Sequence, residues 1–200
     1  MTPEDHAHAG RTLWQAEQAG RQIGLLSLQY PGMTLDDAYA VQAQVVAARA
    51  AAGHRRIGWK IGLTSRAMQE ALGIDTPDSG VLFDDMLFEN AATVPVGRFI
   101  QPRIESELAF VLRADLKGAD VTRDEVLTAT DHVRPSLEIL DTRILRRDPA
   151  TGTARVIADT ISDNAANAGI VLGEVRIDPA TIDLRWIGAI VARDGVVEET

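Results

Sequence analysis

Cysteine is absent from this 200-residue chain. That absence excludes disulfides, thiolate nucleophiles and cysteine-type zinc or iron–sulfur sites. Long apolar runs are missing too: the N-terminus has no apolar signal core, and no stretch is long enough to cross a bilayer. We therefore expect a cytoplasmic protein with no membrane partner.

Positive charge is scarce relative to negative charge, and the formal net charge is -9. Such a field repels phosphate backbones, so we expect no nucleic-acid partner. An anionic substrate would need a local cation, which a bound metal ion could supply. The sequence also lacks Walker, G-x-S-x-G and G-x-G-x-x-G motifs, and its four histidines have no metal-ligand spacing in a structured segment.

The pattern of apolar residues divides the chain near Gly53. Residues 3–28 predict an amphipathic helix, and a second helix begins after the N-cap Thr34 and stops at Gly53. Short strands then follow with a few helices, one of them at 65–72. We therefore predict a helical arm over 1–55 and a catalytic domain over 56–200.

Three further segments of the second region have distinct signatures. Thr122 to Glu125 is a capping box that opens a helix, and residues 159–169 predict a polar loop rich in Asp and Asn. Residues 184–200 predict a β-hairpin with Asp194-Gly195 as its turn. The second arm of this hairpin is short, so we expect the chain to be the front part of a longer protein.

The carboxylates in the segment PRIESELAFVL are the sharpest candidate site. Glu105 and Glu107 share one face of a strand, because side chains alternate, while apolar residues such as Leu108 and Phe110 would face a core. Glu138 lies in another apolar strand, SLEIL. Three carboxylates from two strands suit Mg²⁺ or Mn²⁺. A solvated polar face of a sheet would show the same pattern.

Four other residues could belong to a pocket. Lys60 lies between glycines in GWKIG, where partial desolvation would let it act as an acid or base, although an exposed strand lysine fits equally. Asp78 lies in the loop TPDSG and could be a turn former. Ser162 and Asn164 lie in the polar segment and could bind a ligand or cap turns.

Taken together and in order, five stretches resemble the hydratase and decarboxylase branch of the fumarylacetoacetate hydrolase superfamily. The resemblance covers residues 22–200. The five stretches are GWKIGLTSRAMQ, TPDSGVLFDDM, QPRIESELAFVL, PSLEILDTRI and DTISDNAANAGIVLG.

The resemblance implies a fold, a cofactor and partners. The fold is α+β, a mixed and strongly bent β-roll with the N-terminal helices packed around it. Mg²⁺ is the implied cofactor, with Mn²⁺ as a substitute. Members of this branch are homo-oligomers that can pair with a pathway decarboxylase, and their chains run beyond the position matching Thr200. The implied metal ligands are Glu105, Glu107 and Glu138, and the implied catalytic residues are Lys60 and Asp78.

The resemblance also implies an activity, the addition of water to a small 2-oxo acid. Hydratases resembling this chain carry Asp at the position of Asp78, where the related decarboxylases carry an apolar residue. Hydration needs a group that accepts a proton or orients water. SDNAANAG favours 2-oxo-hept-4-ene-1,7-dioate as the substrate, which assigns the chain to aromatic catabolism.

Several alternatives stay open at this point. Within the branch they are hydration of 2-oxopent-4-enoate (2-keto-4-pentenoate) and decarboxylation of 4-oxalocrotonate (2-oxo-3-hexenedioate). Outside catalysis they are a non-catalytic subunit that scaffolds a partner enzyme and an acidic binding module. Retention of the three glutamates with Lys60 and Asp78 disfavours a non-catalytic subunit.

Overall fold

The structure is a computed structural model that describes residues 1–66, 69–70, 74 and 76–199. The helix predicted over 65–72 lies partly outside the described residues. The chain divides into two compact units, each made of several segments. Unit 1 comprises Met1–Leu87, Thr93–Arg103 and Ile139–Gly169, and unit 2 comprises Phe88–Ala92, Ile104–Glu138 and Ile170–Thr200.

Unit 1 begins with three helices, α1 (Pro3–Gln18), α2 (Leu26–Gln29) and α3 (Leu35–Ala51). The predicted N-cap of α3 is confirmed, because the Thr34 side chain accepts a hydrogen bond from the Asp37 backbone. The single predicted helix over 3–28 is wrong, since α1 ends at Gln18. Gly20 then adopts a φ of 58°, which turns the chain, and Ile23 forms an isolated parallel bridge with Ile144.

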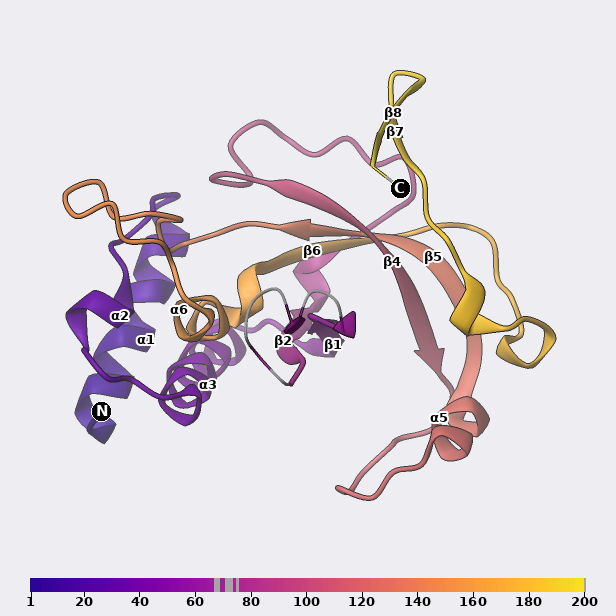
Figure 1. Ribbon diagram of the computed structural model, residues 1–200, viewed down its shortest axis with the longest axis horizontal. Coiled ribbons are helices and arrows are strands. Elements are labelled where there is room, and N and C mark those ends of the chain that lie inside the picture. Colours follow the sequence, from indigo (N-terminus) through magenta and orange to yellow (C-terminus); the bar gives the residue numbers. More distant parts are fainter. Residues whose placement is uncertain (67–68, 71–73, 75, 200) are drawn as a thin grey trace. The chain divides into compact units, whose positions relative to one another are not determined.

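The helices of unit 1 pack on one another and bury its core. Helix α3 contacts both α1 and α6 (Ile157–Ser162), and Figure 1 shows these helices grouped together. Leu13 of α1, Val41 and Val45 of α3, and Ile144 are among the buried side chains of this core. Apolar burial of this kind is the main stabilising contribution to a helical unit.

Unit 1 also contains a two-stranded antiparallel sheet, which carries the candidate residues Lys60 and Asp78. Strand β1 (Arg56–Gly62) pairs with β2 (Asp78–Phe83), and a 3₁₀ turn (Asp84–Met86) follows. Strand β2 is almost wholly buried, whereas β1 alternates between exposed and half-buried side chains.

The prediction of a polar loop over 159–169 is wrong. This segment contains the end of α6, a 3₁₀ turn (Asn164–Ala166) and the start of strand β6 (Asn167–Leu172). Most of its polar residues are buried, and several of them satisfy backbone groups from other elements. Asp159, for example, accepts hydrogen bonds from the backbone N–H and the hydroxyl of Ser27, at 2.8 and 2.7 Å.

A second sheet has four strands in the order β3-β6-β5-β4. Strand β3 is Leu87–Phe88, β4 is Arg103–Leu112 and β5 is Thr130–Leu140. The predicted capping box at Thr122 is confirmed and opens α5 (Arg123–Ala129). Short 3₁₀ turns at Pro179–Thr181 and Leu184–Trp186 precede the terminal hairpin of β7 (Val191–Arg193) and β8 (Val196–Glu199).

The structure confirms one prediction for these strands and corrects another. The hairpin turn at Asp194-Gly195 is confirmed, since both residues have positive φ angles of 51° and 82°. The expected burial of the apolar face of β4 is wrong, because Ile104, Phe110 and Leu112 are exposed. Helix α5, with seven residues, is too short to cover a ten-residue strand.

The predicted mixture of helices and strands is confirmed. The strongly bent β-roll stays a prediction, as does the division of the chain at residue 55. Within the described residues, no helix has the length and apolar character needed to cross a membrane.

Candidate functional site

The structure brings together the three glutamates proposed as metal ligands. Glu105 and Glu107 lie on β4, and Glu138 lies on the neighbouring strand β5. One carboxylate oxygen from each residue lies within 4.8 Å of those of the other two. Glu138 is buried, with only 7% of its surface exposed, whereas Glu105 and Glu107 are exposed.

The chemistry of this donor set fits a hard divalent cation. Three carboxylates at such separations repel one another unless a positive charge lies between them, and the repulsion is strongest where burial removes water. Oxygen-only ligands select Mg²⁺, Mn²⁺ or Ca²⁺ over softer metals. Three ligands would also leave coordination positions for a substrate. The role of the three glutamates as ligands stays a prediction.

Lys60 and Asp78 lie in the paired strands of unit 1. Lys60 faces Gly80 across the β1–β2 register, and Gly62 faces Asp78. A Cβ at Gly62 would lie 2.2 Å from Asp78 Oδ1 and 3.0 Å from Lys60 Nζ. Because Gly62 has no side chain, the Asp78 carboxylate and the Lys60 ammonium group can both occupy the space beside it.

The environment of Asp78 alters its acidity. Burial raises the pKa of the Asp78 carboxyl above its ordinary value of 3.8, while the Lys60 charge and a hydrogen bond from the Gly62 backbone oppose that rise. The residue is only 5% exposed, and its Oδ1 has no hydrogen-bond partner among the described residues. A buried carboxyl beside an ammonium group suits proton transfer.

Asp78 also lines a cavity of about 420 Å³ in unit 1. Its described walls are largely apolar, with Asp78 as the acidic group. Small-molecule sites commonly combine apolar walls with a few polar groups. The lining residues are Leu35, Tyr39, Ile74, Thr76, Pro77, Asp78, Ile157 and Ile161.

Ser162 and Asn164 are buried and hydrogen-bonded to backbone groups. The Ser162 hydroxyl donates to the Ala158 carbonyl at 2.8 Å. The Asn164 amide accepts from the Val81 N–H at 2.7 Å and donates to the Val81 carbonyl at 2.9 Å. These contacts give both residues a structural role, and substrate binding by them stays a prediction.

The turn around Asn164 is strained and lies against strand β2. Asn164, Ala165 and Ala166 have φ angles of 53°, 53° and 58°, a left-handed run that is costly for residues other than glycine. The Asn164–Val81 pair holds this run in place. Gly80 is essential to the approach, because a Cβ there would lie 2.4 Å from the Asn164 carbonyl oxygen.

We expect Gly80→Ala to lower the free energy of unfolding by about 1–3 kcal/mol, because the new methyl group would displace backbone rather than a flexible side chain. Gly58→Ala is the matched control, since a Cβ at Gly58 meets only Leu82 Cδ1 at 3.8 Å. Urea denaturation of the two variants measures the difference. Equal stabilities would contradict the proposed close approach.

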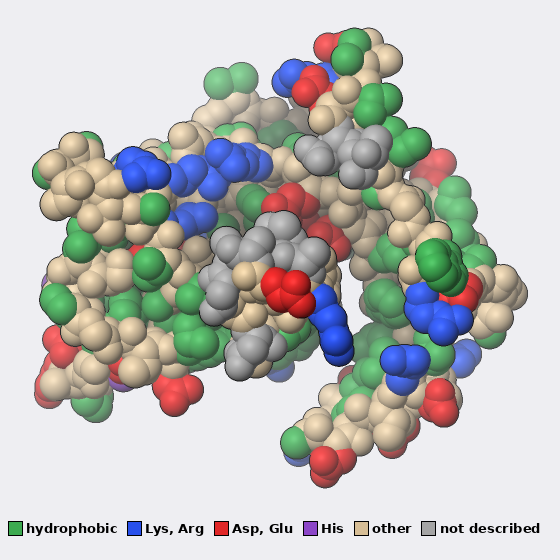
Figure 2. Space-filling view, in the orientation of Figure 1, with side chains coloured by type: hydrophobic (Ala, Val, Ile, Leu, Met, Phe, Trp, Pro, Cys, Tyr) green, Lys and Arg blue, Asp and Glu red, His purple; other side chains and the backbone are tan. Residues whose placement is uncertain are grey.

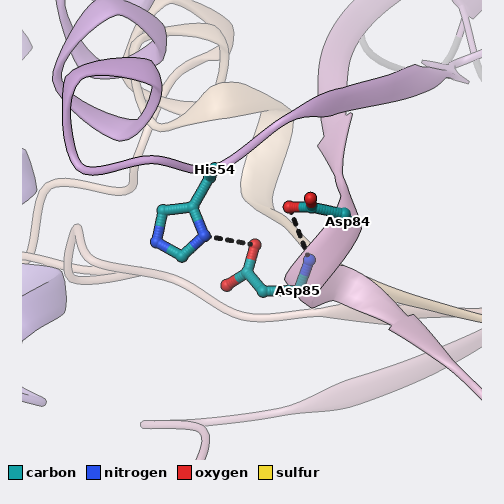
Figure 3. Close-up of side chains that lie close together, drawn as sticks. All are labelled: His54, Asp84 and Asp85. Atoms are coloured by element: carbon teal, nitrogen blue, oxygen red, sulfur yellow. Dashed lines mark hydrogen bonds and ion pairs between the residues drawn. The ribbon is translucent and has the colours of Figure 1, made fainter.

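A second acidic cluster was missed in the sequence, where Asp84 and Asp85 have no obvious partner. His54, Asp84 and Asp85 offer ligand atoms within 4.8 Å of one another. Figure 3 shows the His54 ring facing the Asp85 carboxylate, with Asp84 beside Asp85. Asp85 already lies 3.2 Å from Arg49 and 3.2 Å from Arg98, and its other neighbour is the His54 ring at 3.4 Å. Arg55 lies 3.8 Å from Asp84. Three arginines thus balance the two acids, so an ion-pair network accounts for the cluster.

Known proteins resemble this chain over nearly its whole length. No family model matches it. The 2-oxo-hept-4-ene-1,7-dioate hydratase of Escherichia coli is 50% identical over 199 residues, which are 98% of this chain and 74% of that protein. The 2-keto-4-pentenoate hydratase of Paraburkholderia xenovorans is 43% identical over 195 residues, 98% of this chain and 70% of that protein.

A solved structure agrees with these relatives. The 4-oxalocrotonate decarboxylase from Pseudomonas putida G7, complexed with magnesium and adipate, has a TM-score of 0.89 to this chain. It is 29% identical, and the match covers 99% of this chain and 73% of the decarboxylase. The chain therefore belongs to the 2-oxo acid hydratase family that includes these two hydratases, within the hydratase and decarboxylase branch of the fumarylacetoacetate hydrolase superfamily.

Proposed function

We propose that this chain is a metal-dependent hydro-lyase that converts 2-oxo-hept-4-ene-1,7-dioate to 4-hydroxy-2-oxoheptanedioate in aromatic catabolism. The observation that carries the proposal is the gathering of Glu105, Glu107 and Glu138 from two strands. The substrate follows the name of the relative that is 50% identical. The same proposal includes a homo-oligomer in the cytoplasm, able to associate with a pathway decarboxylase.

The three glutamates would hold the metal ion, with Mg²⁺ as the native ion and Mn²⁺ as a substitute. Solved structures of the related decarboxylase contain magnesium or calcium, which supports a divalent cation. When bound, the ion would supply a Lewis acid for the C1 carboxylate and C2 oxygen of a 2-oxo acid.

Lys60 and Asp78 would move the protons of the reaction. The C2 hydroxyl of the dienol form would lose its proton as a proton is delivered to C5, which leaves a C2 carbonyl conjugated with a C3–C4 double bond. The Asp78 carboxylate then accepts a proton from water as the oxygen bonds to C4, and a proton is delivered to C3. The Lys60 ammonium, beside Asp78 around Gly62, supports the ionised carboxylate and is a proton donor.

Removal of the metal is the first test of this function. We expect EDTA treatment to abolish hydration and added Mg²⁺ to restore it. Glu107→Gln should weaken Mg²⁺ binding in calorimetry by about 10-fold or more, because it removes one of three anionic ligands. Asp120→Asn, at an exposed position between β4 and α5, is the matched control. Full turnover in excess EDTA would contradict the metal role.

Decarboxylation is the second candidate, because the related solved structure is a decarboxylase. Asp78 favours hydration, since adding water needs a proton acceptor that loss of carbon dioxide does not. Product analysis distinguishes the two reactions: hydration of heptenedioate gives the 4-hydroxy acid, whereas 2-oxo-3-hexenedioate would release carbon dioxide. Comparing kcat/KM for heptenedioate and 2-oxopent-4-enoate separates the two hydratase substrates.

A further inference from the structure

Three arginines of unit 1 lie close enough to repel one another. Arg103 begins β4, and Arg146 and Arg155 lie on either side of a loop closed by the bridge between Arg147 and Ala154. The Arg155 N–H donates to the Arg146 carbonyl at 3.0 Å, so these two residues are neighbours across the loop. Figure 2 shows one group of Lys and Arg side chains at the upper left of the face drawn, with others spread over the rest of that face.

The local environment disfavours this concentration of positive charge. Burial lowers the pKa of Arg146, and the charges of Arg103 and Arg155 lower it further, against the opposing effect of Asp141. Burial also lowers the pKa of Arg155. Arginine nevertheless stays charged in proteins, so the repulsion persists unless an anion offsets it.

Two guanidinium nitrogens, Arg146 Nη2 and Arg155 Nη1, are buried atoms of partly exposed side chains. Neither has a hydrogen-bond partner among the described residues. The Nε of Arg146 donates to Gln101 at 3.1 Å, which orients the guanidinium plane. Buried N–H groups without acceptors are rare in folded proteins, and they often indicate an acceptor that comes from outside the chain.

The acids nearest to these arginines are engaged elsewhere. Asp141 accepts the backbone N–H groups of Ile100 and Gln101 at 2.8 and 2.6 Å. Asp163 is bound by Arg143 at 2.6 Å. Asp159 is held by Ser27. None of these three carboxylates is positioned to satisfy the two free N–H groups.

We propose that Arg103, Arg146 and Arg155 bind a carboxylate of a small acid and so select a dicarboxylic substrate. Guanidinium groups bind carboxylates through paired hydrogen bonds, and Arg146 and Arg155 each have a buried N–H donor with no acceptor among the described residues. Arg103 is the first residue of β4. Because side chains alternate along a strand, its side chain lies on the same face as those of Glu105 and Glu107, two of the proposed metal ligands. The role in substrate selection rests on the proposed hydratase function.

The test compares a diacid with a monoacid. For Arg146→Gln, we expect KM for 2-oxo-hept-4-ene-1,7-dioate to rise about 10- to 100-fold, with KM for 2-oxopent-4-enoate unchanged. Arg155→Gln should behave alike, and Arg11→Gln, on the exposed side of α1, should change neither value. An equal loss for both substrates would overturn the proposal.

Calorimetry with non-reacting acids tests the site without turnover. In the presence of Mg²⁺, adipate should bind wild type more tightly than hexanoate does, and Arg146→Gln should remove that preference. If adipate shows this behaviour but wild type hydrates nothing, the hydratase proposal fails and the arginine site stands. Unchanged adipate affinity in the variant overturns the site. Inorganic phosphate binding more tightly than adipate would also overturn it, in favour of an inorganic anion.

Two further measurements distinguish a ligand site from a structural cluster. The thermal midpoint of Arg146→Gln should equal or exceed that of wild type, because the substitution relieves repulsion among like charges. A large fall in that midpoint would overturn the proposal. Light scattering should give the same mass for wild type and variant. Dissociation of an oligomer in the variant would overturn the proposal and indicate that the arginines bind acidic groups of a second copy instead.

Discussion

Asp78→Asn is expected to reduce kcat for hydration by about 10²- to 10⁴-fold, the usual contribution of a general acid or base. The substitution keeps the size and much of the polarity of the side chain, so the Gly62 hydrogen bond and the fold should survive. What it removes is the ability to accept a proton from water. Steady-state hydration kinetics measure the effect, and calorimetry should give an Mg²⁺ affinity equal to that of wild type.

The pH profile gives a second readout of the same residue. Because burial raises the pKa of Asp78 above 3.8, the carboxylate form is lost as pH falls through a value higher than that of an ordinary Asp. The acidic limb of the wild-type kcat/KM profile should therefore lie above pH 3.8, and activity should fall below it. In Asp78→Asn this limb should disappear.

Asp120→Asn is again the control, because it makes the same chemical change at an exposed position. Wild-type hydration rates in Asp78→Asn would exclude Asp78 as the proton acceptor. Loss of Mg²⁺ binding or of thermal stability in that variant would instead indicate a structural role. A variant that fails only in catalysis, and loses its acidic limb, supports the proposed mechanism.

The glutamate cluster could be predicted from sequence because strand geometry is regular. Alternation places Glu105 and Glu107 on one face, and a second strand with an acid in an apolar context supplies Glu138. The pairing of the two strands is a long-range feature that no local pattern contains, so the expectation that the three glutamates converge came from the family resemblance, and the structure shows it.

The segment 159–169 shows why local composition misleads. Asp and Asn favour loops when their side chains satisfy nearby backbone groups. Here they satisfy distant backbone instead: Asp159 binds Ser27, and Asn164 and Asn167 both donate to the Val81 carbonyl. Burial follows from partners that lie over 80 residues away. For the same reason, no sequence pattern could select Arg103, Arg146 and Arg155 from the other arginines.

The buried pair of Arg143 and Asp163 should be critical for the stability of unit 1. Arg143 donates through Nε to Asp163 Oδ1 at 2.6 Å and through its backbone N–H to Oδ2 at 2.8 Å. A third bond runs from Nη2 to the Asp163 carbonyl at 2.7 Å. These bonds hold the residue that immediately precedes the left-handed run at 164–166, so the pair also supports the turn that packs on β2.

We expect Arg143→Met to lower the free energy of unfolding by about 3–5 kcal/mol, because it leaves the buried Asp163 carboxylate without the counter-charge that is hydrogen-bonded to it. Adding Asp163→Asn removes that charge, so the double variant should be less unstable than the sum of the two single changes. Urea denaturation of the four proteins gives the coupling energy. Arg185→Met breaks a pair of similar length, 2.6 Å to Asp183, on the surface, and water there already solvates both charges. That control should unfold like wild type, and an equally mild effect at Arg143 would mean that the buried pair contributes no more than an exposed one.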